Sequence, residues 1–191
     1  MNRIADYITA SRAIIFAPLA GYFLANGFLW PALCAMVLGE LTDAIDGIVA
    51  RKMGQVSAFG KLLDPCCDSI FRMTIWIAML FIGWVPLWAV ILFFTRDSVV
   101  SMIRQVVAKD GTAFAARKSG KIKAALQALA QFTLVASHTF LVSRVTPGAQ
   151  TAAICVAAAA TVWSVVDYSY GAYRGMHARG TRDERRPSYE A

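Results

Sequence analysis

The sequence predicts an all-α membrane protein with six transmembrane helices around a polar chamber that faces the cytoplasm. Hydrophobic residues make up 58% of the 191 residues and charged residues only 16%, whereas about a quarter of the residues in soluble domains are charged. Six apolar segments each approach the ~20 residues needed to cross a bilayer. Nearly all charged residues inside these segments lie toward one membrane side or near the middle, and this pattern predicts the chamber.

The six segments follow one another along a single domain. Their approximate limits are 7–27, 31–51, 58–83, 85–110, 120–142 and 147–173. A short polar lead, 1–6, precedes them. The last segment is followed by a basic tail, 174–191, rich in Arg and Glu, which is predicted to be disordered.

Every segment contains at least one charged residue, and segments two to five contain most of them. In chain order, and leaving aside Arg51, Lys109 and Asp110 at segment ends, these residues are Arg12; Glu40, Asp43 and Asp46; Lys61, Asp64, Asp68 and Arg72; Arg96, Asp97 and Arg104; Lys121 and Lys123; and Asp167. Charged side chains in a membrane are costly, so their clustering indicates a functional site.

The connections predict the orientation. The links 26–30, 82–88 and 143–147 are short and carry Arg144 as their one charge. The opposite side holds most of the remaining Lys and Arg, so the positive-inside rule places that side and both termini in the cytoplasm. Trp30, Trp84 and Trp88 fit an aromatic belt at the outer interface of the cell (inner) membrane.

The net charge of +7 would suggest nucleic acid for a soluble protein. In so apolar a chain, the positive charge instead favours contact with the anionic inner leaflet. The expected partner is therefore a lipid bilayer, and no nucleic acid is expected. The four cysteines, Cys34, Cys66, Cys67 and Cys155, lack zinc or redox spacing and are predicted to pack in a reducing setting. The two histidines are far apart in sequence, which argues against a histidine metal site.

The most informative stretch is Asp43 to Asp68. Asp43 and Asp46 are three residues apart, and Asp64 and Asp68 are four apart, so each pair lies on one face of a helix. A polar turn between the two helices would let them run antiparallel and bring four carboxylates together. Such an oxygen-rich set suits Mg²⁺ or Mn²⁺. The alternative is that these residues are helix caps or solvated loop carboxylates.

This stretch, Asp43-x2-Asp46-Gly47-x2-Ala50-Arg51-x8-Gly60-x3-Asp64-x3-Asp68, resembles the full signature of the CDP-alcohol phosphotransferases (CDP-alcohol phosphatidyltransferases), integral membrane enzymes of phospholipid synthesis. The resemblance implies that an alcohol attacks a CDP-linked lipid and releases CMP. Segment 7–173 would then be the catalytic domain. Two divalent ions, Mg²⁺ or Mn²⁺, would be its cofactors, and a homodimer is expected.

The resemblance also implies roles for individual residues. The metal ligands would be Asp43, Asp46, Asp64 and Asp68, and Asp68 would also be the catalytic base. The CDP-binding surface would comprise Thr42, Asp43, Gly47, Ala50, Arg51 and Gly60.

The acceptor would carry a phosphate, with Arg104, Lys121 and Lys123 as its candidate ligands. Bland alternatives are a snorkelling side chain for Arg104 and topology-setting charge for the two lysines. Three stretches look like the phosphatidylglycerophosphate synthase branch of the family: Ile8-Thr9-Ala-Ser-Arg12, Arg96-Asp97 to Arg104, and Gly120-Lys-Ile-Lys-x3-Gln127. That branch joins glycerol 3-phosphate to the phosphatidyl group of CDP-diacylglycerol and gives phosphatidylglycerophosphate.

Several positions depart from that branch. The segment before the first span reads Arg3-Ile4-Ala5 instead of Asn-Ile-Pro, Asp97 stands where Glu is common, and Ser69 stands where Lys is common. Cys66-Cys67-Asp68 resembles the inositol-phosphate branch. Another acceptor, such as inositol phosphate, is therefore the first alternative. A small ion transporter is the alternative from a different class, since charges inside membrane spans also mark ion pathways.

Overall fold

A computed structural model describes the backbone of residues 4–53, 58–109, 118–140 and 147–183, with the links 54–57, 110–117 and 141–146 outside it. Side chains are described for residues 7, 9–42, 65–103, 119–140, 148–171 and 173. Throughout the described chain every element is a helix, so the all-α prediction is confirmed. The helices are α1 (Ile4–Ser11), a π-helical segment (Arg12–Phe16), α2 (Ala17–Ala25), α3 (Leu29–Met53), α4 (Ala58–Phe81), α5 (Leu87–Lys109), α6 (Lys118–Phe140) and α7 (Pro147–Asp183).

The first helical run is interrupted by a π-helical turn. It begins at Arg12 and lies directly between α1 and α2. π-Turns are rare inside α-helices and occur often at functional sites, because the wider turn changes the direction in which side chains point. Here the turn begins at a buried arginine.

Two of the short links are closed by glycine. Gly27 ends α2 and Gly83 ends α4, with φ angles of 77° and 79° in the left-handed region. At both sites the glycine N–H and the next residue's N–H return to carbonyls three and five residues earlier. This is the Schellman arrangement, and it lets the chain leave one helix and reverse within a few residues.

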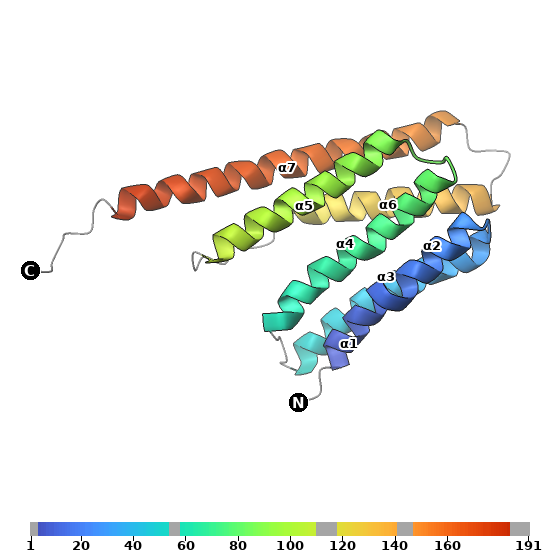
Figure 1. The fold of residues 1–191 in the computed structure, drawn as a ribbon, viewed down its shortest axis with the longest axis horizontal. Coiled ribbons are helices and arrows are strands. Elements are labelled where there is room, and N and C mark those ends of the chain that lie inside the picture. Colours follow the sequence, from blue (N-terminus) through green and yellow to red (C-terminus); the bar gives the residue numbers. More distant parts are fainter. Residues whose placement is uncertain (1–3, 54–57, 110–117, 141–146, 184–191) are drawn as a thin grey trace, which may run out of the picture.

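The helices form one elongated bundle (Figure 1). α4 lies between α1 and α2 on one side and α5 and α6 on the other, and α7 packs along α5 and α6. The links at 26–28 and 82–86 lie at the same end of the bundle, away from the end of α3 and the start of α4. The acidic motif therefore occupies the end opposite these two nearly uncharged links.

Close packing depends on large side chains facing small ones. Trp76 and Phe93 are fully buried, with their ring centroids 4.8 Å apart, and join α4 to α5. A Cβ at Gly39 of α3 would collide with the ring of Phe71 on α4. Small residues at such contacts let helices approach closely, which is the main way that membrane helices gain packing energy.

One described helix, spanning Gly148–Gly171, is long and apolar enough to cross a membrane, and shorter apolar stretches occupy Thr9–Ala25 and Leu29–Thr42. Many large apolar side chains face outward, including Phe81, Phe94 and Trp163. The charged residues of α4, α5 and α6 reduce the apolarity of those helices. The prediction of six membrane spans therefore needs support beyond hydropathy.

The helix limits differ from the predicted segments at the chain ends. The first helix begins at Ile4, within the predicted polar lead. α7 continues to Asp183, whereas the sequence predicted disorder from residue 174 onward. Since no proline occurs between Pro147 and Pro187, the helical hydrogen bonds of α7 can propagate beyond the apolar segment. Residues 184–191 lie outside the described chain.

Candidate active site

The acidic motif lies on α3 and α4. Asp43 and Asp46 belong to the second half of α3, and Asp64 and Asp68 to the first half of α4. The same half of α3 carries Gly47, Ala50 and Arg51, and Gly60 lies near the start of α4. Of all these residues, the structure describes the side chain of Asp68 alone. The helical spacing of each carboxylate pair is thus present, and the predicted cage of four carboxylates stays a prediction.

Thr42, the first predicted CDP-binding residue, is half-buried on α3. Its hydroxyl donates a 2.7 Å hydrogen bond to the carbonyl of Gly39 within the same helix. This bond satisfies the hydroxyl hydrogen and leaves the oxygen able to accept a further bond.

Asp68 lies between two arginines. One carboxylate oxygen is 2.6 Å from Nη2 of Arg12, whose side chain is 3% exposed, and the other is 3.7 Å from Nη2 of Arg72. The Asp68 side chain is 25% exposed. The Arg12 contact has the length of a charge-assisted hydrogen bond. It fixes the predicted base against the first helical run.

A second ionic cluster lies beside that contact and is reached through Ser69, the next residue of α4. Oδ1 of Asp97 accepts bonds from Nζ of Lys123 at 2.6 Å and from Nη1 of Arg96 at 2.9 Å. Its Oδ2 accepts a 3.3 Å bond from the hydroxyl of Ser69, the residue next to Asp68. The cluster therefore links the backbone of the predicted base to α5 and α6.

Polar contacts extend this cluster to α7. Arg96 donates to the hydroxyl of Ser164 at 2.6 Å, and its guanidinium carbon lies 5.6 Å from the ring centroid of Tyr168. Ser119 donates to Asp167 at 2.5 Å. Buried hydrogen-bonded side chains fix the mutual register of helices that would otherwise meet only through apolar surfaces.

The predicted acceptor residues do not share one environment. Lys121 is exposed, whereas Lys123 is only 1% exposed and binds Asp97. Arg104 lies on α5, and its side chain is outside the described part. Lys121 and Lys123 are two residues apart on a helix, so they point in different directions.

Four charged residues of the two ionic clusters were absent from the predicted site: Arg12, Arg72, Arg96 and Asp97. Each occurs within an otherwise apolar segment, and that placement alone marks a residue as functional or structurally paired. What the sequence could not give was the pairing across helices. The Asp97–Lys123 contact joins residues 26 positions apart.

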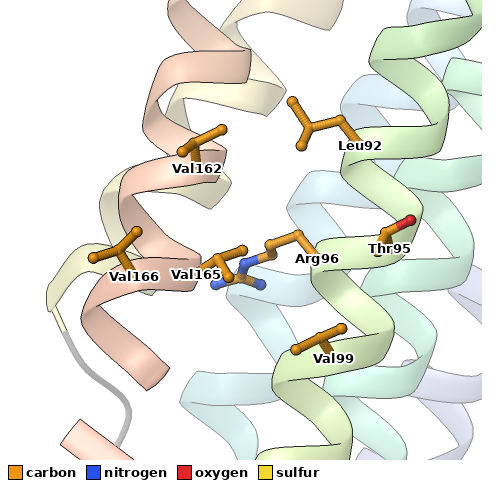
Figure 2. Close-up of a pocket in the computed structure, with 7 residues that line it drawn as sticks. All are labelled: Leu92, Thr95, Arg96, Val99, Val162, Val165 and Val166. Carbon is orange, nitrogen blue, oxygen red and sulfur yellow. The ribbon is translucent and has the colours of Figure 1, made fainter. Parts of the chain in front are cut away.

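A hollow of about 240 Å³ lies between α5 and α7. Its lining comprises Leu92, Thr95, Arg96, Val99, Val162, Val165 and Val166. Figure 2 shows Arg96 extending from α5 toward α7, with its guanidinium beside Val165 and with Val162 above and Val99 below it. Five of the seven lining residues are aliphatic, and Arg96 already donates to Asp97 and Ser164, so this hollow offers few of the donor groups that a nucleotide needs.

The motif's donor chemistry fits a divalent ion. Four carboxylates on two successive helices offer hard oxygen ligands of the kind that Mg²⁺ and Mn²⁺ prefer. Asp68 directs a half-buried carboxylate to a place where Arg12 already compensates its charge. Among the side chains that the structure describes, no group of three His, Cys, Asp or Glu could hold a metal ion. The predicted metal site therefore includes carboxylates whose side chains lie outside the described part, those of Asp43, Asp46 and Asp64.

Comparison with known proteins places this architecture among lipid-synthesis enzymes. Residues 2–163 match the family model described as CDP-alcohol phosphatidyltransferase. A Sodalis glossinidius protein named CDP-diacylglycerol–glycerol-3-phosphate 3-phosphatidyltransferase is 32% identical over 88% of this chain and 94% of its own length. A protein of the same name from Pectobacterium atrosepticum is 31% identical over 74% of this chain and 79% of its own.

The fold agrees with solved structures. The Mycobacterium tuberculosis phosphatidylinositol phosphate synthase with CDP-DAG bound superimposes with a TM-score of 0.66 at 20% identity, covering 88% of this chain and 86% of that one. The same enzyme in complex with manganese and citrate gives a TM-score of 0.67 and covers 88% and 82%. By its sequence match over most of its length, the chain belongs to the CDP-alcohol phosphatidyltransferase family.

Proposed function

We propose that the protein transfers the phosphatidyl group of CDP-diacylglycerol to glycerol 3-phosphate and releases CMP, with Mg²⁺ or Mn²⁺ as cofactor. The observation that carries this proposal is the eight-position acidic motif on α3 and α4, in a chain whose relatives at 31–32% identity are named for this reaction. A relative from Bacillus subtilis, 35% identical over 52% of this chain, has the same name.

Asp43, Asp46, Asp64 and Asp68 would hold the ions. Bound metal would neutralise the pyrophosphate charge of the CDP-lipid and so let a nucleophile approach. The Mycobacterium tuberculosis neighbour solved with manganese supports a metal of this kind. The four carboxylates of the motif would be enough to ligate two ions.

The chain's own side chains would perform the remaining steps. Asp68 takes the proton of the acceptor hydroxyl while that oxygen bonds to the phosphorus of the phosphatidyl group. The bond from this phosphorus to the bridging oxygen breaks, and CMP leaves. Arg12 keeps the Asp68 carboxylate in one orientation, because its contact is short and buried. Positioning a base in this way lowers the cost of reaching the reactive geometry.

The CDP group would lie against α3. Gly47 and Ala50 leave the helix surface open to a ligand, Arg51 offers a bidentate donor to phosphate, and Gly60 and Thr42 complete the surface. Arg104 belongs to the last part of α5 and Lys121 to the first turn of α6, and together with Lys123 they would bind the acceptor phosphate.

The bundle would cross the cell (inner) membrane six times as a homodimer, with the chamber open to the cytoplasm. The outward-facing apolar side chains support burial in lipid. The two Schellman links at the opposite end from the acidic motif match the short outer loops that the positive-inside rule predicts.

An acceptor screen tests the proposal. Purified protein with labelled CDP-diacylglycerol and Mg²⁺ or Mn²⁺ should release CMP and form phosphatidylglycerophosphate when glycerol 3-phosphate is added. Chelation of the metal should abolish this release, and added Mn²⁺ should restore it. Product formation with inositol phosphate alone would show that the proposed acceptor is wrong and that the reaction class is right. The solved neighbour, a phosphatidylinositol phosphate synthase, is the reason for including this acceptor. Absence of CMP release with every acceptor would refute the enzyme proposal.

A further inference from the structure

We propose that Arg72 binds the phosphate of the acceptor and contributes to acceptor selection. This inference rests on the proposed function, because it assigns a further residue to the acceptor subsite. Arg72 lies on α4, one turn beyond Asp68 and outside the acidic motif.

The cationic side chains near Arg72 each have a carboxylate at short distance. Arg96 and Lys123 share the carboxylate of Asp97, at 2.9 and 2.6 Å. Arg12 contacts Asp68 at 2.6 Å. Arg72 also approaches Asp68, but at 3.7 Å, which is an ionic contact beyond hydrogen-bond length. In the described chain, each carboxylate near Arg72 therefore has a closer cation.

Arg72 is nevertheless largely removed from water. Its side chain is 15% exposed, and its buried Nε has no hydrogen-bond partner in the described structure. A guanidinium has five N–H donors and always carries its charge. Leaving it desolvated with one long contact is costly, whereas an anion bound between Arg72 and its neighbours would supply the missing acceptors.

The location of Arg72 favours the acceptor over the nucleotide. Its carbonyl accepts a 2.8 Å bond from Gln131 of α6, and its guanidinium is within electrostatic reach of Lys123 on that helix. The predicted CDP surface belongs to α3 and the start of α4 instead. An acceptor with its phosphate at Arg72 would have its hydroxyl on the side of Asp68, the predicted base.

The local sequence gives a reason for a cation at this position. Ser69 replaces the lysine common after the last motif Asp in the resembling branch, and here its hydroxyl binds Asp97. Ser69 and Arg72 are three residues apart and so lie on neighbouring positions of one helix face. Arg72 thus supplies positive charge on a surface from which a lysine is missing.

The test measures the two substrates separately in Arg72→Met, which keeps the length of the side chain and removes its charge. The KM for glycerol 3-phosphate should rise roughly 10- to 100-fold, the range for losing a charged hydrogen bond. The KM for CDP-diacylglycerol should change by less than about twofold, because the substitution removes no contact to that substrate. Inhibition by inorganic phosphate should weaken in parallel, whereas inhibition by CMP should not.

Two further variants separate binding from packing. Arg72→Lys should recover part of the lost affinity for glycerol 3-phosphate. Gln131→Met removes the α6 contact to the Arg72 backbone without removing charge, so it should lower the melting temperature and leave both KM values near the wild type. If Arg72→Met does not fold, the same comparison of KM values is made with Arg72→Lys, for which a selective rise for glycerol 3-phosphate is still required.

An unchanged KM for glycerol 3-phosphate, or equal rises for both substrates, would overturn the assignment of Arg72. This outcome is distinct from failure of the proposed function. If the proposed function is wrong, the wild-type protein itself shows no turnover with glycerol 3-phosphate.

Discussion

Asp68 unites two requirements that usually oppose each other. A catalytic carboxylate must be accessible to its substrate, and a carboxylate inside a helical bundle must have its charge compensated. The structure meets both, because Asp68 is 25% exposed while Arg12, at 3% exposure, contacts one of its oxygens. The second oxygen makes the longer contact, 3.7 Å, with Arg72.

Replacing Asp68 by Asn should remove catalysis in a protein that still folds but melts at a lower temperature, because the buried Arg12 loses its carboxylate. Asn has the same shape but cannot take the acceptor proton, so CMP release should fall by about 10²- to 10⁴-fold, the range for losing a general base. Thermal stabilisation of the protein by CDP-diacylglycerol with metal should persist.

A matched control is Asp167→Asn, which changes a carboxylate on α7 that binds Ser119 away from the motif. It should retain turnover within a few-fold of the wild type. Substantial CMP release by the Asp68 variant would refute the base assignment.

Arg12 should matter for stability as well as for activity. Arg12→Met would leave the Asp68 carboxylate without its short contact. Losing one partner of a buried ion pair costs about 3–5 kcal/mol, and we expect about 2–4 kcal/mol here because Asp68 is partly exposed. Melting of the purified protein in detergent should report the loss as a lower midpoint.

Arg12→Lys provides the comparison for this prediction. It keeps the charge but lacks the planar fork of the guanidinium, so it should recover part of the stability and less of the turnover. Equal melting midpoints for wild type and Arg12→Met would show that the ion pair contributes nothing to the fold.

At the scale of helices, the apolar segments predicted the elements well and their irregularities poorly. The limits of 58–83 and 120–142 lie within a few residues of α4 and α6. The π-turn at Arg12 could not be predicted, because an apolar stretch looks alike whichever carbonyl each N–H binds. The extension of α7 beyond residue 173 was not predicted, because the polar composition of the tail is typical of disorder.

For the candidate site, the sequence predicts which residues share a helix face but not which residues meet across helices. Spacing within one helix pairs Asp43 with Asp46 and Asp64 with Asp68, because the helical period alone decides it. Contacts between helices depend on tertiary packing, so the partners of Asp68 and Asp97 could not be read from the sequence. For the same reason the contact of Lys123 with Asp97 was not predicted, and the role of Lys123 toward the acceptor stays a prediction.

The Asp97–Lys123 pair should behave as a unit that links α5 to α6. Asp97→Asn would leave Lys123 and Arg96 buried without their carboxylate, and the expected loss of stability is about 3–5 kcal/mol. Adding Lys123→Met removes one of the uncompensated charges, so the double variant should be more stable than the sum of the two single changes predicts by about 1–3 kcal/mol.

Melting of the wild type, both single variants and the double variant completes this cycle. Ser164→Ala is a useful fourth change, because it removes a partner of Arg96 on α7 without touching Asp97. Additive effects of the Asp97 and Lys123 changes would show that the two side chains are not coupled.

At the scale of the whole molecule, large apolar side chains lie on the outer surface, while several polar side chains lie inside among the apolar core residues. Large apolar side chains such as Phe81 and Tyr7 are mostly exposed, while Lys123, Gln127 and Gln131 are almost fully buried. In water, buried apolar side chains and exposed polar side chains would be more favourable. A bilayer explains it, because lipid accepts the outer apolar surface and the polar side chains satisfy one another inside.

The proposed orientation places the turn at Asn26 outside the cell and the tail inside. We expect Asn26→Cys, in a variant whose four native cysteines are replaced by alanine, to react in intact cells with a maleimide that cannot cross membranes. Asn26 is exposed beside the Gly27 turn, so access should not be limited by the fold. A cysteine placed at Ser188 should react only after the cells are permeabilised. Labelling of both positions in intact cells, or of Ser188→Cys alone, would reverse or break the six-span arrangement and move the acidic motif away from the cytoplasmic side.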